Sequence, residues 1–110
     1  MSRHDERVDA VFAALADPTR RAVLGRLAAT PAVTATELAG PLPVTRQAVV
    51  KHLQALSEAG LVTGRRHGRE VRYEITPAPL GDAVGWIVSV GAEWDRRLAR
   101  LRRQLGGRSA

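Results

Sequence analysis

Hydrophobic residues recur at helical spacing in two segments near the start of the chain. Val8, Val11, Phe12 and Leu15 follow an i, i+3, i+4, i+7 pattern, which predicts an amphipathic helix over about residues 5–16. Asp17 and Pro18 then supply an N-cap carboxylate and a proline at the first helical position. We therefore expect a second helix to begin at Pro18, with Val23, Leu24, Leu27 and Ala28 on one face and a tight corner between the two helices.

The next segment carries the signals of two further helices separated by a turn. After a loop over residues 30–33, Thr34-Ala35-Thr36-Glu37 fits a capping box that begins a short helix, and Gly40-Pro41 ends it. Thr45 can cap a longer helix from Arg46 to about Ala59, which Gly60 ends. A short helix, a turn and a longer helix predict a helix-turn-helix over about residues 34–60.

After residue 60, hydrophobic and polar residues first alternate as in a strand, and the helical spacing of hydrophobic residues returns from about residue 80. Residues 61–66 and 69–76 resemble the strands of a hairpin that turns at His67-Gly68, so a wing is expected over about residues 61–76. Pro77 and Pro79 mark its exit, and residues 80–105 predict one long helix. The expected fold is a mainly α winged helix-turn-helix, with five helices and a two-stranded hairpin in a single domain over residues 1–110.

The last predicted helix is longer than a domain of this size can cover, and Trp86 and Trp94 lie on its broad apolar side. An intramolecular core or a ligand pocket between the tryptophans are alternatives, but we favour a dimer built from the helices at about residues 5–16 and 80–105. The expected interface residues are Val8, Val11, Phe12, Leu15, Trp86, Ile87, Val90, Trp94, Leu98 and Leu101.

Composition narrows the possible functions. The chain has 17 Lys plus Arg against 11 Asp plus Glu, a formal net charge of +6, and only Lys51 among the basic residues is a lysine. Arginine favours bidentate contacts with phosphate and guanine, so this balance indicates nucleic acid, although ribosome-binding and anionic-membrane proteins share it. The absence of cysteine excludes disulfides, thiolate metal sites and cysteine nucleophiles.

Neither a membrane span nor an export signal is expected. The longest mainly apolar stretch, residues 83–92, is too short to span a bilayer. The first nine residues lack the apolar segment of a signal peptide. We therefore expect a cytoplasmic protein, associated with the nucleoid when bound to DNA.

The helix that begins at Arg46 has two distinct faces. Val49, Leu53 and Leu56 form a buried stripe, which leaves polar and basic residues on another face. An ordinary solvated face is the alternative, but the arginines of the adjacent hairpin favour nucleic-acid binding, since Arg and Gln match base edges in the major groove. The expected DNA-binding residues are Thr45, Arg46, Gln47, Val50, Lys51, His52, Gln54, Arg65, Arg66, Arg69 and Arg72. For His52 we weigh a phosphate contact against local packing.

Three motifs together resemble the ArsR family of winged-helix repressors: residues 14–21 (ALADPTRR), residues 42–53 (LPVTRQAVVKHL) and residues 58–62 (EAGLV). The resemblance covers roughly residues 8–105. It implies a dimer whose first and last helices pair across a two-fold axis, with the Arg46 helix in the major groove of double-stranded DNA. It also implies repression from a palindromic operator, often that of the protein's own operon.

The sequence departs from the metal-sensing members of that family. Residues 35–40 contain no cysteine, and the last helix carries Asp82, Glu93 and Asp95 but no histidine. We therefore expect the metal-independent branch, with no metal and no cofactor, and an effector that the sequence leaves open. No catalytic triad, paired carboxylates or phosphate-binding glycine loop is present, so no enzymatic activity is expected. A winged-helix module that binds RNA, the ribosome or a protein partner is the alternative function.

Overall fold

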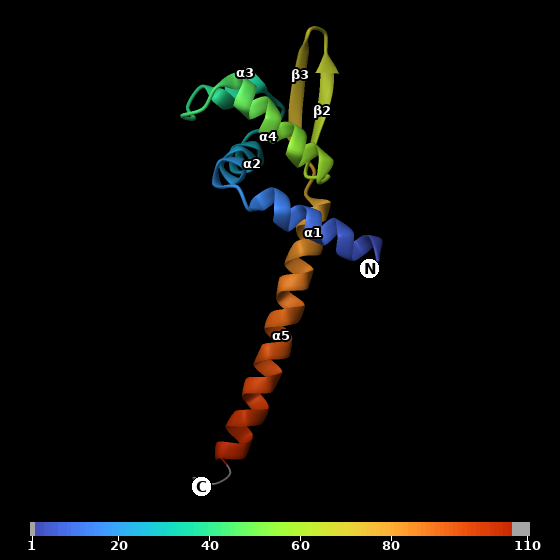
Figure 1. The fold of residues 1–110 in the computed structure, drawn as a ribbon, viewed down its shortest axis with the longest axis vertical. Helices are drawn as coiled ribbons and strands as arrows, with labels where there is room; N and C mark the ends of the chain where they lie inside the picture. The colour runs from blue at the N-terminus through green and yellow to red at the C-terminus, as the bar shows by residue number, and fades with distance from the viewer. Residues whose placement is uncertain (1, 107–110) are drawn as a thin grey trace.

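The mainly helical winged architecture is confirmed over residues 2–106, which the computed structural model describes. The elements in chain order are α1 (Arg3–Leu15), α2 (Pro18–Ala29), β1 (Val33–Thr34), α3 (Ala35–Ala39), α4 (Arg46–Glu58), β2 (Val62–His67), β3 (Glu70–Ile75) and α5 (Ala78–Gly106). Figure 1 shows α1 to α4 and the hairpin gathered at one end, while α5 projects away from them as a single long helix. The molecule measures 71 × 31 × 20 Å. No helix within residues 2–106 is long and apolar enough to cross a membrane.

Helices α1 to α4 each begin at a side-chain cap. The side-chain oxygens of Ser2, Asp17, Thr34 and Thr45 each accept a hydrogen bond from the backbone amide three residues later, at 3.0–3.2 Å. The caps predicted at Asp17, Thr34 and Thr45 are thus confirmed, since each satisfies an amide that the first turn leaves unpaired. Only half of the capping box at Thr34 forms, because the Glu37 carboxylate points toward Arg72 instead.

Two arginines of α2 hold the corner between α1 and α2. The guanidinium of Arg20 donates to the carbonyl oxygen of Ala14 at 3.3 Å, and that of Arg21 donates to the carbonyl oxygen of Leu15. The last carbonyls of a helix have no partner within the helix, so these arginines satisfy groups that the end of α1 would otherwise leave to water. The residues that follow Asp17-Pro18 therefore have a structural role in the corner.

The core lies where α1 to α4 meet the base of the hairpin. Val11, Leu27, Leu38 and Leu61 are at most 1% exposed, and the predicted stripe of α4, Val49, Leu53 and Leu56, has no exposure at all. Fully burying an aliphatic side chain contributes roughly 1.5–3 kcal/mol. The stripe thereby fixes the inner face of α4 and leaves its opposite face to solvent.

The end of α4 turns the chain into the hairpin. Gly60 has a φ of +79°, a left-handed conformation that favours glycine. The amide of Leu61 donates to the carbonyl oxygen of Leu56 at 2.9 Å, and the amide of Gly60 donates to that of Ser57 at 3.0 Å. These two bonds form a Schellman motif, which confirms the predicted helix end.

The sheet differs from the prediction in two respects. Val33, predicted as loop, and Thr34, predicted as a helix cap, also form strand β1, which pairs with β3 through Val33 and Tyr73, so the sheet has three strands in the order β1-β3-β2. The hairpin turns at Gly68-Arg69, one residue later than predicted, because His67 pairs with Glu70. Gly68 has a φ of +63° and Arg69 does not have a positive φ, as in a type II′ turn.

The start of α5 also differs. The helix begins at Ala78, two residues earlier than predicted, with Pro79 in its first turn. A proline is tolerated there because the amide it lacks would have no partner within the helix. Pro79 was therefore wrongly taken as part of the exit from the hairpin.

The N-cap carboxylate of Asp17 should make stability depend on pH. The hydrogen bond from the Arg20 amide is the main cause that lowers the pKa of Asp17 below its ordinary value of 3.8, and the charges of His52 and Arg20 act in the same direction. Because the pKa of Asp17 is lower in the folded chain, its ionised carboxylate stabilises the fold at pH values above the ordinary pKa of 3.8. This contribution is lost as the pH falls through the folded-state pKa. We expect the wild type to exceed Asp17→Asn in urea midpoint at pH 7, and this difference to shrink below pH 4. A difference that stays constant down to pH 2.5 would contradict this cause.

Candidate nucleic-acid interface

The outer face of α4 presents most of the predicted contact residues together. Gln47, Lys51 and Gln54 are exposed and Val50 is half-buried, on the side away from the buried stripe. Arg46 is exposed in the first turn, but it lies three residues before Val49 and therefore at the edge of this face, toward α3. Thr45 is exposed too, although its hydroxyl serves as the N-cap. An α-helix with such a face fits the width of a DNA major groove.

Helix α3 orients the first of these side chains. The Nε of Arg46 donates to the hydroxyl of Thr36 at 3.1 Å. This bond holds the arginine stem, and the two terminal nitrogens of the guanidinium make no hydrogen bond within residues 2–106. A pre-oriented guanidinium loses less conformational entropy when it contacts a base edge or a phosphate.

A groove joins α4 to the hairpin. It is lined by α3, by the outer face of α4 and by the tip half of β3; the side chains that line it include Thr36, Glu37, Arg46, Val50, Arg69 and Tyr73. In Figure 1 the hairpin extends from the body on the side away from α5. The helix face and the wing therefore border one continuous surface, as predicted.

The arginines of the wing lie on different faces of the hairpin. Arg65 pairs across the strands with Arg72, and Arg66 pairs with Val71. Directly paired residues share a face, so Arg66 lies on the side of Val71 and Arg65 on the opposite side. Arg65, Arg66 and Arg69 are all exposed, and the Nε of Arg66 donates to the carbonyl oxygen of Gly68 at 3.4 Å.

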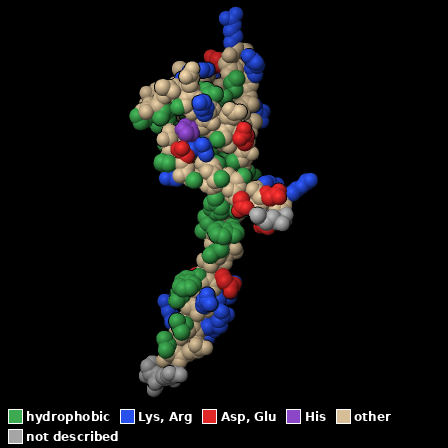
Figure 2. Space-filling view, viewed as in Figure 1, with side chains coloured by type: hydrophobic (Ala, Val, Ile, Leu, Met, Phe, Trp, Pro, Cys, Tyr) green, Lys and Arg blue, Asp and Glu red, His purple; other side chains and the backbone are tan. Residues whose placement is uncertain are grey.

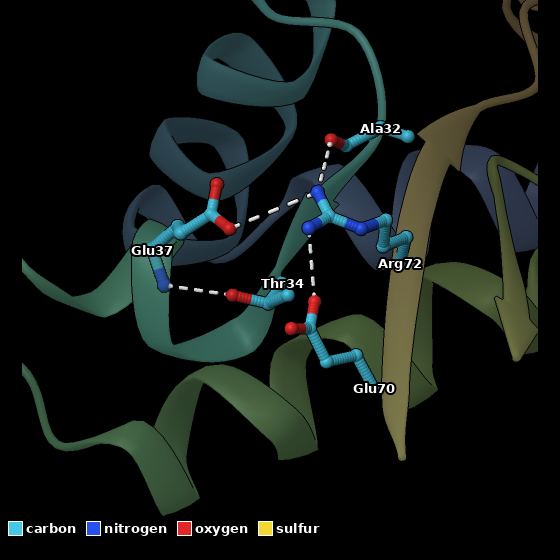
Figure 3. A network of polar contacts seen from close by, with 5 residues as sticks. All are labelled: Ala32, Thr34, Glu37, Glu70 and Arg72. Carbon is cyan, nitrogen blue, oxygen red and sulfur yellow. Dashed lines mark hydrogen bonds and ion pairs between the residues drawn. The ribbon is translucent and has the colours of Figure 1, made fainter. Parts of the chain in front are cut away.

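The side chain of Arg72 contacts three other residues of the same chain (Figure 3). Its guanidinium donates to the carbonyl oxygen of Ala32 at 3.3 Å and to the carboxylate of Glu70 at 2.9 Å, and it lies 3.8 Å from the carboxylate of Glu37. Two carboxylates compensate its charge, and its side chain is 35% exposed. Arg72 thus ties β3 to α3 and to the segment before β1, a role that the sequence analysis missed.

His52 lies at the inner edge of the α4 surface. The side chain is half-buried, and its Nδ1 is enclosed without a hydrogen-bond partner within residues 2–106. It is close enough for its charge to lower the pKa of Asp17 at the start of α2. This geometry favours local packing between α4 and α2 over a phosphate contact.

The predicted dimer residues separate into two groups. Val8 and Val11 are 4% and 0% exposed within a single chain, so they belong to its core and have almost no surface to give to a partner. Phe12 and Leu15 are half-buried, and the Phe12 ring meets Trp86 edge-on with centroids 5.5 Å apart. The remaining residues lie along α5, where Leu98 is half-buried and Trp86, Ile87, Val90, Trp94 and Leu101 are about half exposed. Figure 2 shows hydrophobic side chains on the surface of the long helix below the body.

Within residues 2–106, no group of three or more His, Cys, Asp or Glu side chains is placed to hold a metal ion.

The family comparisons agree with this geometry. Residues 15–65 match a family model described as a helix-turn-helix domain. The chain is 41% identical over 86 residues to the uncharacterized HTH-type transcriptional regulator YuzN of Bacillus subtilis, covering 72% of this chain and 94% of that protein. It is 29% identical to the transcriptional repressor SdpR of the same species, over 72% of this chain and 87% of that protein. These relatives are transcriptional regulators and not enzymes, in agreement with the sequence prediction.

Solved structures resemble the whole fold. An ArsR-like transcriptional regulator from Rhodococcus sp. RHA1 superposes with a TM-score of 0.77 at 44% identity, covering 89% of this chain and 92% of that one. A homodimeric winged helix-turn-helix DNA-binding domain from Mycobacterium bovis, described as a possible ArsR-family regulator, gives a TM-score of 0.63 at 28% identity. That alignment covers 76% of this chain and 79% of the other.

The different environments of Arg65 and Arg72 predict different effects on DNA binding. Arg65→Ala should weaken binding to every duplex and reduce the salt dependence by about one phosphate contact, a slope change of about 0.9. Arg72→Ala should weaken binding with an unchanged slope and should also lower the urea midpoint, because it releases the wing from α3. Fluorescence anisotropy titrations at four salt concentrations measure both slopes. An equal loss of slope in Arg72→Ala would show that Arg72 contacts phosphate directly.

Proposed function

This chain belongs to the ArsR-like family of winged helix-turn-helix transcriptional regulators, and on that premise we propose that it represses transcription as a homodimer bound to a palindromic operator. The observation that carries this proposal is the outer face of α4. The buried stripe turns Gln47 and Lys51 outward, and Arg46 is exposed at the edge of the same face in the first turn, beside a basic wing. Its natural ligand is a DNA major groove, where Arg and Gln distinguish guanine and adenine by paired hydrogen bonds.

The exposed apolar side of α5 supports the homodimer. Trp86, Ile87, Val90 and Trp94 are each about half exposed, and monomeric proteins rarely expose so large a contiguous apolar surface. The related domain from Mycobacterium bovis is homodimeric. In a two-fold dimer the two α4 helices would enter successive major grooves, about 34 Å apart along the duplex, which is why we expect a palindromic site.

Repression follows from where such a dimer binds. A protein that occupies a promoter excludes RNA polymerase from it without needing a catalytic group or a cofactor. The related SdpR is a transcriptional repressor. We further propose that the operator lies upstream of the protein's own gene, so that the protein limits its own synthesis.

Anisotropy titrations on the protein's own upstream DNA and on a scrambled duplex test the proposal. Each duplex is titrated at low and at near-physiological salt. We expect tighter binding to the upstream duplex that persists at the higher salt, because base contacts are less salt-dependent than phosphate contacts. Equal binding that collapses with salt, or equal competition by structured RNA, would contradict sequence reading, since side chains cannot enter the A-form major groove.

Substitutions on α4 should separate base reading from phosphate contact. Gln47→Ala, and likewise Arg46→Ala, should reduce the preference for the operator by about 1–3 kcal/mol, because each removes a side chain suited to a base edge. Lys51→Ala should weaken binding to operator and scrambled DNA alike. The ratio of the two dissociation constants is the measurement. Equal losses on both duplexes for Arg46→Ala would remove the base-reading role of Arg46.

A further inference from the structure

Two arginines of the candidate interface are tied to consecutive residues of α3. The Nε of Arg46 donates to the hydroxyl of Thr36, ten residues earlier in the chain, and the guanidinium of Arg72 lies 3.8 Å from the carboxylate of Glu37. Thr36 precedes the reading helix and is not among the residues expected to contact DNA. It nevertheless lines the groove that α4 shares with the wing. Thr36 can therefore act on DNA through Arg46.

The backbone that carries the hydroxyl of Thr36 is anchored on both sides. Ala35 and Leu38 are 5% and 1% exposed and belong to the core. The hydroxyl of Thr34 caps the helix at its start. Threonine is branched at Cβ, so its own side chain has few rotamers. The hydroxyl of Thr36 is thus a fixed acceptor, and the long, exposed side chain of Arg46 is the partner that it restrains.

The bond also determines which donors of Arg46 remain available. A guanidinium can present two donors along its side, from Nε and one terminal nitrogen, or two at its end, from both terminal nitrogens. Thr36 holds the Nε, and across the described residues neither terminal nitrogen of Arg46 has a hydrogen-bond partner. The N7 and O6 atoms of guanine are a pair of acceptors in the major groove that matches such a pair of donors. The end of the guanidinium is therefore left intact for a base edge.

We propose that Thr36 is a positioning residue that determines specificity: its hydroxyl holds the Nε of Arg46 so that the two terminal nitrogens read one guanine. This inference rests on the proposed function, in which α4 lies in the major groove. Without the hydroxyl, Arg46 is free to turn toward a phosphate, which every sequence supplies. When DNA covers the groove, less water competes for the hydroxyl, so the bond is stronger in the complex than in the free protein.

Two substitutions at one position test the role of the hydroxyl. Thr36→Val removes the acceptor and keeps the branched shape, whereas Thr36→Ser keeps the acceptor. The probes are a duplex that the wild type selects from random-sequence DNA and a set in which each G·C pair of that duplex is replaced in turn by A·T. Fluorescence anisotropy gives the dissociation constant of each variant on each duplex.

The expected result is a loss of discrimination at one base pair. The wild type should lose about 5- to 150-fold in affinity when the guanine read by Arg46 is replaced. Arg46→Ala identifies that pair, because its discrimination should disappear there alone. Thr36→Val should lose most of the discrimination at the same pair and keep it at the others, and Thr36→Ser should behave as the wild type.

A double variant separates positioning from direct contact. In the Arg46→Ala background, Thr36→Val should cost nothing further, because the hydroxyl has no guanidinium left to hold. Thr63→Val is the matched control. The exposed hydroxyl of Thr63 hydrogen-bonds with that of Thr76 at 2.7 Å, so its removal should leave discrimination unchanged at every pair.

Three outcomes would overturn the inference. One is wild-type discrimination at every pair in Thr36→Val, and another is an even loss at all pairs, as a distorted fold would give. The third is a further loss in the double variant, which would show that Thr36 contacts DNA itself. A wild type that selects no sequence, or an Arg46→Ala variant that discriminates as the wild type does, would instead refute the proposed base reading, and with it this inference.

Discussion

The burial of Val49, Leu53 and Leu56 fixes the rotation of α4 about its own axis. These three side chains have no exposure, and a rotation of the helix would expose at least one of them at a cost of roughly 1.5–3 kcal/mol. The positions of Gln47 and Lys51 on the outer face follow from that constraint, while the hydrogen bond to Thr36 orients Arg46 at its edge. The Thr45 cap and the Schellman motif at Gly60 fix where the helix begins and ends, so the core and the caps together determine what the outer face presents.

The wing depends on a second set of contacts. A hairpin of two strands is marginally stable in isolation, and this one projects from the body. Strand β1 adds a third strand beside the middle of β3, and Arg72 connects β3 to Glu37 of α3. Glu37 and Glu70 place negative charge beside a basic surface, and the single charge of Arg72 offsets one of the two carboxylates. The network thus holds the wing near α4 and reduces the negative charge on the groove without cancelling it.

Local signals were sufficient to predict most of the fold, while long-range partners were not. The caps at Asp17 and Thr45 and the end at Gly60 act within a few residues, so the sequence pattern shows them directly. Strand β1 and the Arg72 contact join residues 40 positions apart, and alternation predicts a strand face but not its partner. Val8 and Val11 share the spacing of Phe12, and periodicity cannot distinguish a core within one chain from an interface between two. The exposed fractions of Val8 and Val11, 4% and 0%, assign both residues to the core of the single chain.

The hairpin runs directly into α5, and this continuity has a mechanical consequence. The amide of Thr76 donates to the carbonyl oxygen of Leu61 at 2.7 Å, only two residues before α5 begins at Ala78. The helix is therefore a rigid lever attached to the base of the wing. In the homodimer proposed above, an angular change between two such levers would be converted into a larger displacement at the far ends of the bodies that they carry. Any molecule that alters how α5 packs would then alter the separation of the two α4 helices. Because this coupling is reciprocal, binding to DNA, whose helical repeat is fixed, would change the affinity for such a molecule by the same free energy.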